Sequence, residues 1–165
     1  MANKDGRRRF GWVRKLPSGR IQASYLGPDG VRRYAPNTFE SLASANRWLT
    51  LTEAEIIRGE WMAPEAGRVE LTAYAERWIK ERRLAPRTRE LYDGLFRLHV
   101  QPYLGQLTLD TIRTSTVRTW RTRLLSEGRS ATVAAKAYRL LRAVLNTAVE
   151  DGVIRQNPCR VKGAD

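Results

Sequence analysis

The chain has 165 residues, with 30 Lys and Arg against 17 Asp and Glu, and its formal net charge is therefore +13. The length allows one ordinary domain or two small ones, and a hydrophobic content of 42% is enough for packed cores, which excludes wholesale disorder. No apolar run is long enough for a membrane span or a signal peptide, and one cysteine and one histidine exclude a disulfide and a familiar zinc site. We therefore expect a cytoplasmic protein that binds no metal and no cofactor.

Residues 10–35 predict three short antiparallel strands. In the run 20–26, Ile21, Ala23 and Tyr25 alternate with polar residues, which is typical of a strand with one buried face. Turn residues at 17–19 and 27–30 separate this run from a strand on either side. Such a meander cannot bury its apolar face alone, and a cover is therefore required.

The next segment predicts that cover. Ser41 can cap a helix with an apolar stripe at Leu42, Ala45, Leu49 and Ile56, which would lie on one face of the sheet. Polar and basic side chains on the other face can contact base edges and phosphates, and an arginine-rich arm before the first strand can add phosphate contacts. The predicted contacts are Arg7, Arg8 and Arg9 in the arm and Trp12, Arg14, Arg20, Gln22, Ser24 and Arg33 on the sheet.

Residues 59–69 contain a proline and two glycines without periodicity and predict a linker. Apolar stripes at helical spacing then predict a bundle of four helices. We expect the second helix to begin at Pro86 and to end before Pro102, and the fourth to be capped by Ser130. His99 lies near a helix end, and we interpret it as structural.

Two predicted helix starts carry basic and hydroxyl side chains. Backbone N–H groups at a helix start point at a bound anion, so each start is a candidate phosphate site, although a Ser or Thr there is usually only a cap. The candidates are Arg87, Thr88 and Arg89 at the second helix and Arg129, Ser130 and Thr132, with Lys136 and Arg139 farther along, at the fourth.

The positive charge is divided between two parts of the chain. Residues 1–36 carry a net +7, residues 37–69 a net −2 and residues 70–165 a net +8. Of the 30 basic residues 25 are Arg, whose planar fork suits phosphates and guanine edges. We therefore expect double-stranded DNA as the partner. An RNA-binding protein ranks lower, because only Trp12 is an aromatic candidate on the outward face of the sheet.

The order of these motifs resembles a known family. Residues 10–60 carry G-W-V-R-K-L-P-S-G-R-I-Q-A-S-Y, a turn, a basic strand and T-F-E-S, and they are similar to the arm-type DNA-binding domain of phage and mobile-element integrases. Residues 70–158 resemble the SAM-like core-binding domain of the same tyrosine recombinases. The second resemblance rests on Thr88, Tyr92, residues 102–105, Leu107, Leu109, Ile112, Ser130, Thr132, Ala148, residues 152–154, Asn157 and Pro158.

The resemblance implies an α+β chain: an arm-type domain over 1–58, a linker over 59–69, a SAM-like four-helix domain over 70–158, and the start of a linker to a catalytic domain over 159–165. It implies that the arm-type domain binds arm-type sites in the DNA and that the core-binding domain binds core-type sites. The family's His-x-x-Arg box is absent from these 165 residues, so we nominate no catalytic residue and expect the fragment alone to be inactive.

The same resemblance implies a recombinase that integrates or excises a phage or mobile element, that acts at the nucleoid of a bacterial host, and that self-associates only on DNA through the full-length protein. The alternative is a complete DNA-binding regulator with two modules and no recombinase activity. A reading frame that continues beyond residue 165 would distinguish the integrase from the regulator.

Overall fold

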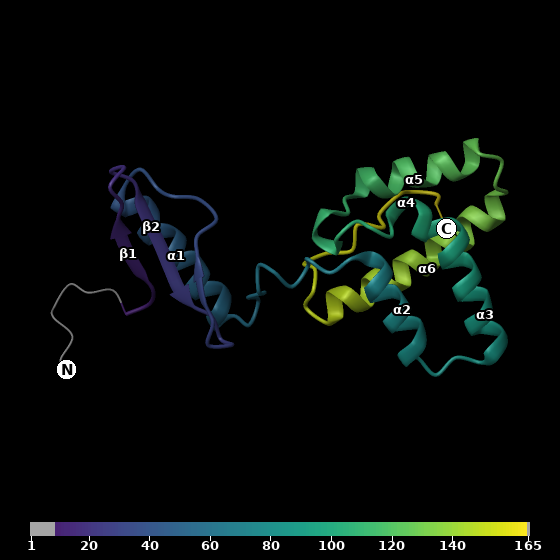
Figure 1. Ribbon diagram of the computed structural model, residues 1–165, viewed down its shortest axis with the longest axis horizontal. Helices are drawn as coiled ribbons and strands as arrows, with labels where there is room; N and C mark the ends of the chain where they lie inside the picture. The colour runs from purple at the N-terminus through teal and green to yellow at the C-terminus, as the bar shows by residue number, and fades with distance from the viewer. Residues whose placement is uncertain (1–8, 165) are drawn as a thin grey trace. The chain divides into compact units, whose positions relative to one another are not determined.

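Three short strands form the first part of the chain in the computed structural model, which describes residues 9–164 (Figure 1). Strands β1 (Trp12–Lys15), β2 (Ile21–Leu26) and β3 (Arg32–Tyr34) are antiparallel and adjacent in the order β1-β2-β3. At the first turn Gly19 has φ 80°, a conformation that glycine adopts without strain, and its N–H donates to the Leu16 carbonyl at 2.9 Å. The predicted meander is confirmed.

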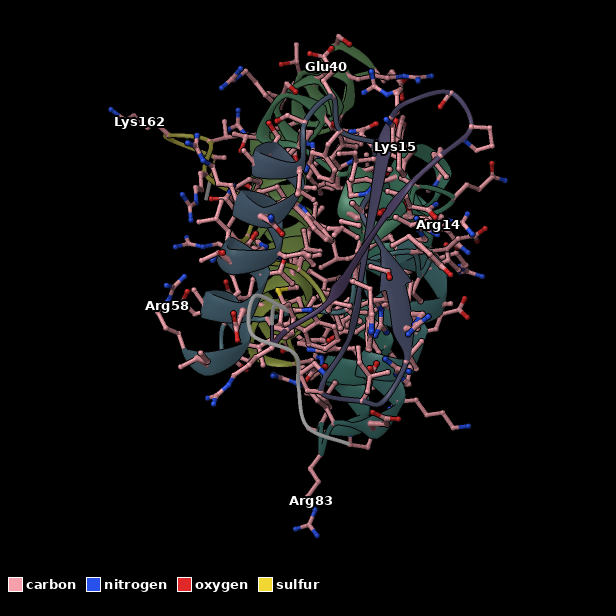
Figure 2. All side chains as sticks on the ribbon, turned by 90° about the vertical axis from the view of Figure 1, so that its left-hand side faces the viewer. Arg14, Lys15, Glu40, Arg58, Arg83 and Lys162 are labelled. Carbon is pink, nitrogen blue, oxygen red and sulfur yellow. The ribbon has the colours of Figure 1, made fainter. Side chains whose placement is uncertain are left out.

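Helix α1 (Leu42–Ile57) covers one face of this sheet (Figures 1 and 2). Its first turn is capped by Ser41, whose Oγ accepts the N–H of Ser44 at 3.1 Å. Burial of apolar surface holds the two layers together. The core of this unit consists of Ala23, Tyr25, Ala45 and Leu49, with partly buried Phe10, Ile21, Phe39, Trp48 and Trp61 around them.

The second unit is a helical bundle, as predicted. Its long helices are α2 (Leu71–Glu81), α3 (Pro86–Leu95), α5 (Thr114–Ser126) and α6 (Ala131–Glu150), with a short 3₁₀ turn η2 (Leu109–Thr111) between α3 and α5. Eight side chains of α6 are buried, so this helix forms the centre of the core. Polar ends of two buried aromatic residues on α2 bond to α6: Trp78 Nε1 donates to Thr147 at 2.8 Å, and the Tyr74 hydroxyl donates to Asp151 at 2.5 Å. The α+β fold class is confirmed.

Helix α3 ends at Leu95, before Pro102 as predicted, but the helical path does not stop there. It continues through a π-helical turn η1 (Phe96–Val100) into α4 (Gln101–Leu104). A proline inside a regular α-helix lacks an N–H and collides with the carbonyl four residues earlier. The wider turn, in which the Gln101 N–H bonds to the Phe96 carbonyl, accommodates the ring. The indole N–H of Trp120 donates to the His99 carbonyl at 2.7 Å and anchors this turn to α5.

The predicted linkers are packed against the two units. The chain divides after Ala63, and Trp61 bonds to the Tyr25 hydroxyl of the first unit at 3.0 Å. Residues 64–69 belong to the second unit, where the Val69 carbonyl accepts the Leu109 N–H at 3.0 Å. Cys159 and Ala164 are buried in the core of the second unit. The division after Ala63 falls within the predicted linker 59–69.

Among residues 9–164, no helix is both long and apolar enough to cross a membrane. The long α6 contains three basic residues and an acid, and it is buried by neighbouring helices.

The two separate cores predict independent losses of stability. Leu49 is fully buried in the first core, so Leu49→Ala should destabilise that unit by about 2–5 kcal/mol through lost burial and a residual cavity. Leu51, on the same helix, is 61% exposed, and Leu51→Ala should change stability by less than about 0.5 kcal/mol. Chemical denaturation followed by hydrogen exchange measures both units. Equal destabilisation of the helical bundle by Leu49→Ala would contradict the separation of the cores.

Candidate nucleic-acid interface

The strand register determines which side chains the sheet presents on the side away from α1. Trp12 pairs with Ser24, and Ser24 pairs with Tyr34, so these three residues cross the sheet on one face. Arg14 pairs with Gln22, and its Nη2 lies 3.4 Å from the Gln22 Oε1. Figure 2 shows Arg14 directed away from α1. This free face of the sheet consists of Trp12, Arg14, Gln22, Ser24, Leu26, Arg32 and Tyr34.

Arg33 is not on the free face, and its predicted position was wrong. It pairs with Tyr25, a core residue, and is only 8% exposed. Both terminal nitrogens of Arg33 donate to the carboxylate of Asp29 at 2.7 Å, and its guanidinium lies 5.0 Å from the centre of the Trp61 ring. The hydrogen bond from Arg33 lowers the pKa of Asp29 to about 2. Arg33 therefore stabilises the hairpin and is inaccessible to DNA.

Sequence reasoning missed Arg32 and Tyr34, which occupy the free face in place of Arg33. The loop between β2 and β3 spans Gly27 to Val31, and Leu26 consequently pairs with Arg32. A loop one residue shorter would have reversed the faces, because a one-residue change of register turns every side chain of a strand over. Positions 32 and 33 are both arginine, so the residue types alone do not show which of the two faces the core.

Two further predicted sheet residues have surroundings that limit their contact with a ligand. Arg20 donates to the Oγ1 and the carbonyl oxygen of Thr38 at 2.6 and 2.5 Å, and its Nη1 lies 3.8 Å from Glu40, so it fixes the segment before α1. Ser24 is 6% exposed and is covered by its neighbours. In the predicted arm, Arg9 is exposed, whereas Arg7 and Arg8 lie outside the described residues.

At the start of α3, the predicted residues separate into two groups. Arg87 is exposed and Thr88 is half-buried. Arg89 turns back toward α2, and it donates to the carbonyl oxygens of Ile79 at 2.6 Å and Arg82 at 2.9 Å. The last carbonyls of a helix have no partner within the helix, and Arg89 satisfies those of α2. Arg89 is therefore a capping residue, contrary to its prediction as a phosphate contact.

At the start of α6, the Ser130 hydroxyl accepts the Val133 N–H at 3.2 Å and is occupied as a helix cap. Arg129, Thr132, Lys136 and Arg139 are all exposed. Thr132, Lys136 and Arg139 follow a spacing of four and three residues, which places them on one side of the helix. The charged residues of α6 are all basic until Glu150.

The two helix starts lie near opposite ends of α3. The Tyr103 hydroxyl on α4 donates to Glu127, which lies two residues before Arg129, so the start of α6 lies near the helical segment that follows α3. Burial and the positive charge of Arg129 lower the pKa of His99 in that segment. Arg87 lies in the first turn of α3, eight residues and about 12 Å before the end of this helix at Leu95. The structure therefore does not join the two starts into one anion site. The described Nδ1 of His99 is buried without a partner.

Three further side chains in the helical unit have raised pKa values. Burial raises the pKa of the Cys159 thiol to about 12, which keeps it protonated. Burial and a hydrogen bond to Asp151 raise the pKa of Tyr74, and a hydrogen bond to Glu127 raises that of Tyr103, so neither phenol is moved toward its nucleophilic form. Over residues 9–164, no cluster of three His, Cys, Asp or Glu side chains could hold a metal ion.

Comparison with known proteins matches each unit to a described domain. Residues 9–58 match the family "Phage integrase, N-terminal domain", and residues 71–125 match "Phage integrase, N-terminal SAM-like domain". The integrase of Mycobacterium phage L5 is 39% identical over 170 residues, which cover 96% of this chain and 45% of that protein. The chain thus spans a little under half the length of this curated relative.

Two solved structures have similar folds. A lambda integrase dimer bound to a COC' core site aligns with a TM-score of 0.54 and 17% identity, over 99% of this chain and 47% of the lambda chain. The Tn1549 transposon integrase in complex with circular intermediate DNA aligns with a TM-score of 0.53 and 25% identity, over 57% of this chain and 31% of that chain.

The buried position of Arg33 predicts an acid-dependent loss of stability. The pKa of Asp29 is about 2 in the folded chain against an ordinary value of 3.8, so this pair stabilises the first unit above pH 3.8 and the contribution disappears as the pH falls toward 2. Arg33→Ala should lower the melting temperature of the first unit by several degrees at neutral pH and remove this acid-dependent component. Arg32→Ala serves as the control, and equal melting curves for the two variants would contradict the assignment.

The capping role of Arg89 predicts that its replacement lowers the stability of the helical unit. Arg89→Ala should destabilise the helical unit by about 1 kcal/mol, because the hydrogen bonds to the carbonyls of α2 are lost. Arg87→Ala, two residues earlier and fully exposed, should leave the unfolding midpoint in urea unchanged. Indistinguishable midpoints for the two variants would disprove the capping role.

Proposed function

The chain belongs to the phage integrase family of tyrosine recombinases, and we propose that it forms the DNA-binding portion of a site-specific recombinase. The observation that carries this proposal is the free face of the sheet. The described residues on that face include two arginines and an amide and no carboxylate. A surface of this chemistry attracts the phosphates of DNA and presents donors and acceptors to base edges.

The dimensions of the sheet support insertion into a major groove. Neighbouring strands lie about 4.8 Å apart, so the two outer strands are separated by about 10 Å. The major groove of B-DNA is about 12 Å wide and admits flat β structure. In that arrangement the middle of the free face would meet base edges, and Arg14, on the outer strand β1, would meet a phosphate backbone.

The helical unit supports a second contact with DNA. Lys136 and Arg139 lie on one side of α6, and Arg129 precedes this helix. Arg87 lies about 12 Å from the other end of α3, which is the end nearer to Arg129. Phosphates on the two sides of a major groove are separated by a similar distance, about 12 Å or slightly more. We propose that these basic residues hold the two backbones while α3 and α6 approach the groove between them.

The two units are proposed to bind different DNA segments. The sheet unit would bind arm-type sites and the helical unit core-type sites of an attachment region, so that a phage or mobile element is integrated or excised in a bacterial cell at the nucleoid. Two linked modules increase each other's effective concentration on such DNA without new contacts. Strand cleavage is proposed to belong to a further domain of the recombinase, and self-association to occur on DNA through the full-length protein. No residue of these 165 is proposed as catalytic.

RNA binding is the competing assignment, and one observation bears on it. Tyr34 is 56% exposed on the free face, which adds a second exposed aromatic residue beside Trp12. Aromatic platforms stack unpaired bases in RNA-binding sheets. However, the guanidinium of Arg32 lies over the Trp12 ring, 4.2 Å from its centre, and occupies one face of that ring. Double-stranded DNA therefore remains the proposed partner.

The proposal predicts salt-dependent binding that is reduced by removing charges from α6. Each phosphate contact contributes a slope of about −0.9 to the dependence of log K on log salt, so Lys136→Ala with Arg139→Ala should lower the slope by about 2. Fluorescence anisotropy of the full chain with a duplex of mixed sequence, between about 50 and 200 mM NaCl, measures this slope. Arg123→Ala is the matched control, because Arg123 is paired with Glu127 at 2.8 Å.

Three outcomes would contradict the proposal. A flat salt dependence would exclude phosphate contacts, and equal slopes for the double variant and the wild type would exclude the α6 contacts. Preference for single-stranded RNA over the DNA duplex in competition would favour the RNA assignment. Sequencing the gene beyond codon 165 tests the wider proposal: a recombinase requires a continuing frame with a His-x-x-Arg box and a later tyrosine, and a stop codon would favour the stand-alone regulator.

A further inference from the structure

A single cation–π contact crosses the middle of the free face. Trp12 lies on β1 and Arg32 lies on β3, and the guanidinium carbon of Arg32 is 4.2 Å from the centre of the Trp12 ring. Strand β2 separates β1 from β3, so these two side chains meet above the middle strand. The guanidinium is thereby placed near the centre of the face, although its backbone belongs to an outer strand.

The residue beneath this contact is small. Ser24 pairs with Trp12 on one side and with Tyr34 on the other, and it is 6% exposed although it faces away from α1. Trp12 itself is 50% exposed. The indole and the guanidinium therefore form the outer layer of the face, and a larger side chain at position 24 would hold them apart.

Arg32 keeps its hydrogen-bonding groups available. The acidic residue nearest in the hairpin is Asp29, and both of its carboxylate oxygens accept from the adjacent Arg33 at 2.7 Å. Within residues 9–164, Arg32 has no hydrogen bond or ion pair, and its described contact is the Trp12 ring. The two neighbouring arginines thus have different roles. Arg33 pairs with Asp29 on the side of the sheet that faces α1, and the N–H donors of Arg32 remain available on the free face.

Stacking on an aromatic ring orients a guanidinium without consuming its donors. The contact uses the flat face of the group, while the N–H donors lie in its plane and point outward at its edge. A guanine presents O6 and N7 in the major groove, and the planar fork of Arg matches this pair of acceptors. Holding the flexible side chain in place before binding reduces the entropy lost when the base is contacted.

We propose that Arg32 is a specificity-determining residue that contacts a guanine edge in the major groove, and that Trp12 is the positioning residue that orients it. This inference rests on the proposed function, and it assigns to one side chain the recognition of a base pair. Its position over the middle strand places it toward the floor of a groove. Arg14, near the end of β1, is the comparison residue for phosphate contact.

Selection from a randomised DNA duplex library by the full chain tests the proposal. The wild type should select a motif with a G·C pair favoured by about tenfold or more at one position. Arg32→Ala and Arg32→Lys should both lose that preference, the second without losing charge. Trp12→Ala should lose it as well although no charge is removed, and Trp12→Phe should retain part of it. Arg14→Ala should lower overall affinity while preserving the preference.

The outcomes separate the inference from the function on which it rests. If Arg32→Ala lowers the affinity for all sequences equally and the G·C preference remains, Arg32 is a phosphate contact and the proposal is wrong. If Trp12→Ala keeps the preference, Trp12 does not position Arg32. Circular dichroism identifies a variant that fails to fold, and in that case Arg32→Lys and Trp12→Phe decide the result. A wild-type chain that binds no duplex overturns the DNA-binding function itself.

Discussion

The pairing of Tyr25 with Arg33 is the constraint on which the candidate interface depends. Tyr25 is buried against α1, and its partner in the next strand must point to the same side of the sheet. A guanidinium on the core side requires a counter-charge, which Asp29 supplies from the hairpin loop. Gly27 makes room for this arrangement, because a Cβ at that position would lie 2.6 Å from both the Arg33 Nη1 and the Asp29 Oδ1. The register, the ion pair and the loop therefore specify one another, and together they leave Arg32 and Tyr34 on the free face.

Much of the fold follows from sequence patterns, because burial imposes a period on the chain. Alternation at Ile21, Ala23 and Tyr25 identified the sheet face beneath α1, and apolar stripes identified the four long helices. The continuation of the helical path beyond α3 and through Pro102 was missed because proline normally ends a helix. The compensation comes from a π turn and from the indole of Trp120, a residue on another helix, and local sequence carries no signal for such a distant partner.

The candidate site was less predictable than the fold because the role of an arginine depends on what lies within reach of its guanidinium. Arg20, Arg33 and Arg89 resemble Arg14, Arg32 and Arg87 in sequence context. Tertiary structure brings carbonyl or carboxylate oxygens to the first three and leaves the others exposed. In the case of Arg89, a sequence signal existed: it lies seven residues after Arg82, at whose carbonyl α2 has just ended. A long donor placed soon after a helix end is positioned to cap it.

The net charge of +13 does not equal the number of basic side chains that are available to bind a phosphate. Arg33, Arg58 and Arg123 face carboxylates, so their charges are compensated locally. Arg89 and Arg121 donate to backbone carbonyls, so their donors are not available to bind a phosphate. Because a carbonyl carries no net charge, both residues still contribute to the positive potential around the helical unit. In the proposed complex, long-range attraction of DNA therefore depends on more arginines than the direct contacts with DNA do. In the proposed complex, Arg121→Ala would weaken this attraction without removing a contact with DNA, whereas Lys136→Ala would weaken it and also remove a contact with DNA.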